Sequence, residues 1–75
     1  MMQTKFIIQM TTPGRPDLTY FFAGNRLGSN VFELRKSLAH RYDTLEEAQG
    51  LADIFQDGAS IAGETYTVKT VRCST

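Results

Sequence analysis

The segment Thr44-Leu45-Glu46-Glu47 carries the signature of a helix N-terminus, and it constrains the fold more than any other part of the chain. The Thr44 hydroxyl can accept a hydrogen bond from the backbone amide of Glu47, which satisfies a donor that the first turn leaves open. Apolar residues then recur at helical spacing on one face: Leu45, Ala48, Leu51, Ala52 and Phe55. Gly58 fits a C-cap. The pattern predicts one amphipathic helix over 44–57.

Two runs before this helix have the composition of β-strands. Residues 5–11 (KFIIQMT) and 18–23 (LTYFFA) are rich in apolar, β-branched and aromatic side chains. Pro13-Gly14 between them is a strong turn signal, because proline presets φ and glycine accepts a positive φ. We therefore predict a β-hairpin with a six-residue loop over 12–17.

The next part of the chain fits two structures. Residues 25–30 (NRLGSN) have the composition of a loop, and 31–42 (VFELRKSLAHRY) follow. As a strand, alternate apolar residues of 31–42 share one face: Phe32, Leu34, Leu38 and Tyr42. As a helix, Val31, Leu34 and Leu38 form one stripe, and Asn30 with Glu33 resembles a capping box. The longer alternation favours a strand over at least 37–42.

A final strand completes the element order. Residues 59–63 form a connector, and 64–72 (ETYTVKTVR) alternate between two faces as a strand does. The order ββ(β)αβ predicts the α+β class, with one helix packed on a mainly antiparallel sheet of three or four strands. The sheet face away from the helix is expected to be partly solvated. With 75 residues, the chain is one domain over 1–75.

Charge is segregated along the chain although the net charge is 0. Residues 1–42 carry six basic and two acidic side chains, a balance of +4, whereas 43–64 carry six acidic side chains and no basic one, a balance of −6. Residues 65–75 add +2. The neutral total argues against a uniformly basic nucleic-acid binder. It allows a molecule with one acidic and one basic surface.

The acidic residues gather on one side of the predicted helix. At about 100° per residue, Glu46, Gly50, Asp53 and Asp57 lie in one stripe opposite the apolar face, with Glu47 beside it. Outer helix faces are commonly charged and solvated. That ordinary interpretation leaves unexplained the absence of any lysine or arginine over 43–64, which a binding surface would explain. The predicted partner is a protein with a basic surface.

Catalytic, metal and cofactor motifs are missing from the sequence. Ser37 stands three residues before the lone His40, which places the two on opposite faces of a strand. Asp53 and Asp57 could be mistaken for a pair of acid–base carboxylates, but on the outer side of a helix a solvated pair is the better interpretation. The loop between Gly24 and Gly28 lacks the Gly-Lys-Ser/Thr ending of a phosphate loop. We predict no catalytic residue, no metal site, no cofactor and no enzyme activity.

The single cysteine and the short apolar runs bear on location. Cys73 cannot form an internal disulfide, and we expect a reduced thiol on a fraying strand end. No apolar run approaches the ~20 residues of a membrane-spanning helix. Independence of disulfides suits a reducing compartment. These features predict a cytoplasmic protein without membrane attachment.

Two hypotheses for function follow. The hairpin followed by the helix start at 42–48 (YDTLEEA) resembles many small phage and mobile-element proteins, a resemblance that covers one helix start and transfers no site residue. The first hypothesis is a non-enzymatic protein-binding module, such as a phage accessory protein that inhibits a host defence factor in the manner of an anti-CRISPR protein. The alternative is nucleic-acid binding or a homodimer, through basic residues on the hairpin and sheet side: Arg15, Arg26, Arg35, Lys36 and Arg41.

Overall fold

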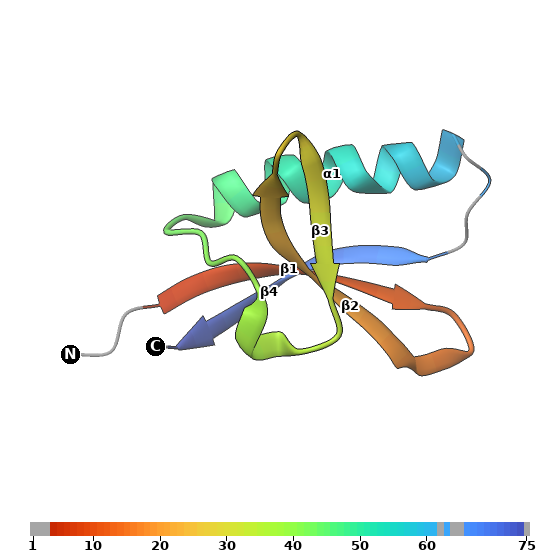
Figure 1. The fold of residues 1–75 in the computed structure, drawn as a ribbon, viewed down its shortest axis with the longest axis horizontal. Helices are drawn as coiled ribbons and strands as arrows, with labels where there is room; N and C mark the ends of the chain where they lie inside the picture. Colours follow the sequence, from red (N-terminus) through yellow and green to blue (C-terminus); the bar gives the residue numbers. More distant parts are fainter. Residues whose placement is uncertain (1–3, 62, 64–65, 75) are drawn as a thin grey trace.

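Four strands form one antiparallel sheet with a single α-helix on one face, in a computed structural model that describes residues 4–61, 63 and 66–74 (Figure 1). The elements are β1 (Thr4–Thr12), β2 (Arg15–Arg26), β3 (Ser29–Glu33), the 3-10 turn η1 (Lys36–Leu38), α1 (Leu45–Ile61) and β4 (Thr67–Ser74). The strand order is β3-β2-β1-β4, and each neighbouring pair is antiparallel. The predicted α+β class is confirmed.

The first hairpin is confirmed, but its loop is shorter than predicted. Only Pro13 and Gly14 form the turn, because Thr12 already pairs with Arg15. Gly14 has a φ of 77°, which a residue without a Cβ adopts at little cost. The predicted loop over 12–17 is therefore wrong.

A second hairpin stands where the sequence predicts a loop. Arg26 of β2 pairs with Ser29 of β3, so only two residues form the turn. These are Leu27 and Gly28, with φ of 52° and 82°. Two successive positive φ values define the type I′ turn that matches the twist of paired strands. The prediction of a loop over 25–30 is wrong, and leucine is an unusual residue for the first turn position.

The predicted strand over 37–42 is also wrong. β3 ends at Glu33, the chain makes the turn η1, and Tyr42 forms only an isolated bridge to β1. Phe6 and Tyr42 exchange two backbone hydrogen bonds of 2.9 and 2.8 Å, and the His40 amide donates to the Phe22 carbonyl at 2.8 Å. Residues 40–42 therefore lie between Phe6 of β1 and Phe22 of β2 and bond to both strands, and we call this segment the wedge.

The wedge coincides with a bend in β2. Pairing between β1 and β2 runs from Gln9 opposite Phe21 toward the Pro13-Gly14 turn. The β2–β3 register then shifts between Phe22 and Asn25, around Gly24 with a φ of 105°. The second hairpin thus leaves the plane of the sheet and rises toward α1 (Figure 1).

The predicted helix start is confirmed, and the predicted end is wrong. The Glu47 amide donates to the Thr44 hydroxyl at 3.3 Å. Past Gly58 the helix continues to Ile61, because Ala59 is buried and extends the packed face by one turn. That packing outweighs the roughly 1 kcal/mol cost of a glycine inside a helix. Residues 59–61 of the predicted connector therefore belong to α1. The last strand, predicted over 64–72, is confirmed as β4 but runs over Thr67–Ser74, and residues 64–65 lie outside the described residues.

The main core lies between α1 and the sheet. Ile8 and Phe22 of the sheet meet Ala48 and Ala52 of the helix, and all four are buried. The rings of Phe22, Phe32 and Phe55 meet at centroid distances of 5.1 to 5.7 Å. The alanines let the helix backbone approach the sheet, and the aromatic rings fill the remaining space. Leu45, predicted for the apolar face, is 46% exposed at the helix start.

A smaller cluster covers part of the opposite sheet face. Ile7, Phe21 and Ala39 are buried there, with Val71 and Cys73 packed against them. Ala39 follows η1, which lies on the side of the sheet away from α1 (Figure 1). This face is partly solvated, as expected, because Thr67 and Lys69 of β4 are exposed while the cluster around Ile7 is buried. Cys73 lies inside β4 opposite Lys5, so the expected fraying end is wrong as well.

Candidate protein-binding surface

The predicted acidic residues lie exposed on α1. Glu46, Glu47, Gly50, Asp53 and Asp57 are all exposed. The helix carries two acidic residues in its first turn and no basic residue in its last turn. Carboxylates in the first turn favour the helix, because they face its positive end, but Asp57 near the other end gains nothing from it. Helix stability therefore accounts for only part of this charge.

A hydrogen-bond chain joins the acidic side of α1 to the edge strand β4. Gln49 donates to the Asp53 carboxylate at 2.8 Å and accepts from the Thr70 hydroxyl at 3.2 Å. About two turns further on, Gln56 accepts from the Val68 amide at 2.8 Å and donates to the Tyr66 carbonyl at 3.3 Å. These contacts hold the helix in one orientation on the sheet, so the acidic side is presented rigidly.

Two isoleucines on the same outer side were missed by the sequence analysis. Ile54 is 65% exposed and Ile61 is 89% exposed. At about 100° per residue, both lie close to the Gly50 and Asp57 directions, opposite the buried Ala48 and Ala52. For Ile54 the available signal was its position off the apolar face of the predicted helix, whereas Ile61 stands beyond the predicted helix end. We call Glu46, Gly50, Asp53, Ile54, Asp57 and Ile61 the outer helix face.

Replacing Gly50 by alanine is expected to raise the free energy of unfolding by roughly 0.5–1 kcal/mol. A Cβ built at Gly50 meets nothing within 4 Å, so the better helix propensity of alanine is gained without a clash. Urea denaturation measures the change as a higher midpoint with an unchanged slope. Gly28→Ala is the control and should destabilise the protein, because φ there is +82°. A less stable Gly50→Ala variant would contradict this account.

The predicted basic residues do not share one element of the fold. Arg15 and Arg26 are the first and last residues of β2, and Arg35 and Lys36 stand at η1. The two hairpin turns and η1 lie at separate places on the molecule (Figure 1). All five basic side chains, Arg41 included, are exposed. Any single flat surface can therefore meet only some of them.

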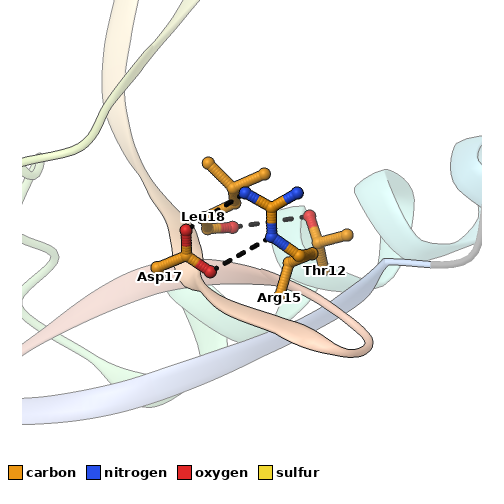
Figure 2. Close-up of polar contacts among 4 residues, drawn as sticks. All are labelled: Thr12, Arg15, Asp17 and Leu18. Atoms are coloured by element: carbon orange, nitrogen blue, oxygen red, sulfur yellow. Dashed lines mark hydrogen bonds and ion pairs between the residues drawn. The ribbon is translucent and has the colours of Figure 1, made fainter.

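Arg15 is engaged by a neighbouring carboxylate. Its guanidinium donates to both Asp17 carboxylate oxygens, at 3.3 and 3.2 Å (Figure 2). The Thr12 hydroxyl donates to the Leu18 carbonyl at 3.4 Å across the same turn (Figure 2). The side chains of Arg15 and Asp17 are both more than half exposed, so the pair adds little stability. It does lower the positive charge that this turn presents.

His40 is held by contacts with Phe22 and Tyr42. Its backbone amide bonds to Phe22, and its ring lies 4.6 Å from the Tyr42 ring and 6.5 Å from the Phe22 ring, measured between centroids. Burial raises the pKa of the Tyr42 hydroxyl, and the charge of Glu47 raises it further. These contacts place His40 and Tyr42 in the wedge that separates β1 from β2.

Lys5 and Asp43 form an ion pair that joins β1 to the segment before α1. The hydrogen bond from Lys5, followed by its positive charge, lowers the pKa of Asp43. A carboxyl group with a lowered pKa in the folded state stabilises that state above its unfolded pKa, and the contribution is lost as the pH falls.

Asp43→Asn is therefore expected to destabilise the protein at neutral pH and to lose this effect in acid. The difference in melting temperature from the wild type should narrow as the pH falls below about 4, where the unfolded carboxyl becomes protonated. Thermal denaturation from neutral to acid pH measures it. Lys5→Met should give the same narrowing, since it removes the other half of the pair. A difference that does not vary with pH would contradict the ion-pair account.

Two absences concern the residues that the structure describes. Among them, no three or more His, Cys, Asp or Glu side chains are arranged to hold a metal ion. No helix in that part of the chain combines the length and the apolar character of a membrane crossing.

Comparison with protein-family models, with curated proteins and with solved structures finds no match to this chain.

Proposed function

We propose that the chain is a non-enzymatic protein-binding module that docks the outer helix face onto a partner with a basic surface. The observation that carries this proposal is the exposure of Ile54 and Ile61 among carboxylates. Exposed apolar side chains with a polar border are typical of protein interfaces, where the apolar part is buried on binding and the charges stay at the rim.

The charge on this face supports a role in partner selection. Glu46, Asp53 and Asp57 are exposed, and 43–61 contain no basic residue that would neutralise them. A one-signed patch speeds the encounter with a patch of opposite sign and disfavours partners of like charge. The isoleucines supply affinity in this scheme, and the carboxylates supply speed and specificity.

Charge reversal tests the proposal. The triple variant Glu46→Lys, Asp53→Lys and Asp57→Lys should lose partner capture while its circular dichroism spectrum stays that of the wild type, because all three side chains are exposed. The control reverses Asp17 and Glu33, which belong to β2 and β3 and not to the outer helix face, and it should retain capture. Association should slow as salt is added, through screening. Undiminished capture by the triple variant would refute this surface.

The finer form of the proposal concerns the process. A basic protein surface that normally holds nucleic acid would accept an acidic helix face, so the chain fits a cytoplasmic phage or mobile-element accessory protein that inhibits a host defence factor. Such an inhibitor should compete with DNA or RNA for the captured partner. A partner that binds nucleic acid and the chain simultaneously, without competition, would contradict this form.

Nucleic-acid binding or self-association through the basic side remains the second candidate. Arg35 and Lys36 support it, since they are adjacent at η1 and both exposed. A gel shift at low salt should then show retardation that Arg35→Glu with Lys36→Glu abolishes. Light scattering at two salt concentrations tests a homodimer. An unretarded nucleic acid together with a monomeric mass would eliminate the second candidate.

A further inference from the structure

A pocket of about 400 Å³ lies beside the β1–β2 hairpin. This hairpin runs away from α1 (Figure 1). Each strand region contributes to its lining: Met10, Thr12, Tyr20, Phe32 and Tyr66. Met10 lies two residues beyond the buried Ile8, and Tyr20 lies two residues before the buried Phe22. Since strand side chains alternate, the pocket continues the apolar face of the core past the helix.

The lining is mainly aromatic, and none of the described residues that form it carries a charge. Three of these five residues are aromatic, Met10 carries a thioether, and hydroxyls are contributed by Thr12 and by the two tyrosines. The Phe32 ring contacts the rings of Phe22 and Phe55 at centroid distances of 5.7 and 5.5 Å, so one wall of the pocket belongs to the packed core. Tyr20 is 38% exposed and forms part of the mouth. Such a site is concave, mostly apolar and formed before any ligand arrives.

From this lining we infer that the pocket binds a small, uncharged aromatic molecule that carries a hydrogen-bond donor. Aromatic rings and a methionine sulfur attract a planar ring through edge-to-face and sulfur–aromatic contacts that a saturated ring cannot make. A charged ligand would lose its hydration shell on entering the pocket, and no charge on the described lining residues would compensate for that loss.

The donor requirement comes from Thr12. Its hydroxyl proton is already directed to the Leu18 carbonyl, so the Thr12 oxygen offers the pocket an acceptor (Figure 2). The volume suits one or two fused rings, because pockets of about 300–1,000 Å³ hold small-molecule ligands. A single aromatic side chain of a protein partner would leave much of this space empty.

Titration of the isotope-labelled protein with four matched probes tests the inference by NMR. Naphthol should shift the Met10 methyl and the Tyr20 and Tyr66 ring signals, with a dissociation constant on the order of 1 mM for so small a ligand. Its saturated analogue decahydronaphthol and the anion naphthoate should bind roughly tenfold more weakly or not at all. Equal binding of either, or no naphthol shift at about ten times that concentration, would overturn the inference.

The fourth probe carries the same ring on a peptide backbone. N-acetyl-naphthylalaninamide should bind no more tightly than naphthol. Tighter binding would assign the pocket to a side chain of a protein partner and overturn the small-molecule assignment. The variant with Glu46, Asp53 and Asp57 replaced by lysine should bind naphthol as the wild type does. The pocket and the proposed protein-binding function can therefore fail separately.

Variants at the mouth complete the test. Tyr20→Leu keeps an apolar strand residue and removes the ring, and it should weaken naphthol binding roughly three- to tenfold. Tyr20→Phe should restore the binding, since it restores the ring. Leu27→Ala, at the fully exposed tip of the second hairpin, is the control and should bind as the wild type does. Unaltered binding by Tyr20→Leu, with its backbone spectrum intact, would place the ligand elsewhere.

Discussion

Phe22→Ala is expected to lower the free energy of unfolding by about 3–5 kcal/mol. Phe22 is 3% exposed, and its ring contacts Phe32 and Phe55 at centroid distances of 5.7 and 5.1 Å. Its removal leaves a cavity between α1 and the bend in β2, and the helix cannot close this cavity because Ala48 and Ala52 already rest on the sheet.

The loss expected for Phe22→Ala is a large part of the total free energy of unfolding. A domain of 75 residues has an expected stability of roughly 4–11 kcal/mol. Urea denaturation followed by circular dichroism should therefore show Phe22→Ala at or near the limit of folding. Leu34→Ala, at a residue that is 57% exposed, should change the stability by about 0.5 kcal/mol or less. Similar losses for the two variants would contradict the assigned core.

Ile7→Ala is expected to cost about 2–5 kcal/mol, although Ile7 lies on the sheet face away from the helix. Ile7 is 1% exposed in a cluster with Phe21 and Ala39, and Val71 packs against it. A large effect would show that the segment around η1 buries this part of the sheet face, as α1 buries the opposite face. On a solvated face the same substitution would cost only a fraction of this amount.

A graded series separates the burial of Ile7 from its strand propensity. Ile7→Val removes one methylene and should cost about 0.5–1.5 kcal/mol. Ile7→Thr has the shape of Ile7→Val but carries a hydroxyl in place of one methyl, in the same cluster. If the cluster is packed as described, Ile7→Thr is much less stable than Ile7→Val. Equal stability of the two variants would indicate a solvated site. Thermal melts at one pH are sufficient to rank them.

Elements defined by local pattern were predictable. The start of α1 follows from Thr44 and Glu47, and the first hairpin follows from Pro13-Gly14, because each signal acts within a few residues. The acidic residues could be grouped correctly for the same reason, since their relative placement depends on one helix alone. Their use as a partner surface stays a prediction.

Elements defined by distant contacts were not predictable. The alternation of 31–42 resembles a strand, but Tyr42 and His40 bond to Phe6 and Phe22 at a gap that exists only once β2 bends. Gly58 resembles a helix end, but burial of Ala59 carries α1 further. The pocket joins residues of several strands, so no local signal marks it. The spread of the basic residues likewise depends on the tertiary fold.

The pairing of β1 with β4 has a consequence for the rate of folding. β1 occupies an interior position of the sheet, and its partner on one side comes from the far part of the sequence, with Lys5 opposite Cys73. The two hairpins close loops of two residues, whereas this ladder must close nearly the whole chain, and long loops are slow to close. Topologies dominated by such pairs fold in milliseconds to seconds, well after hairpins and helices first appear. The arrival of β4 is therefore expected to be the slow event, and substitutions in β4 that slow folding would mark it as such.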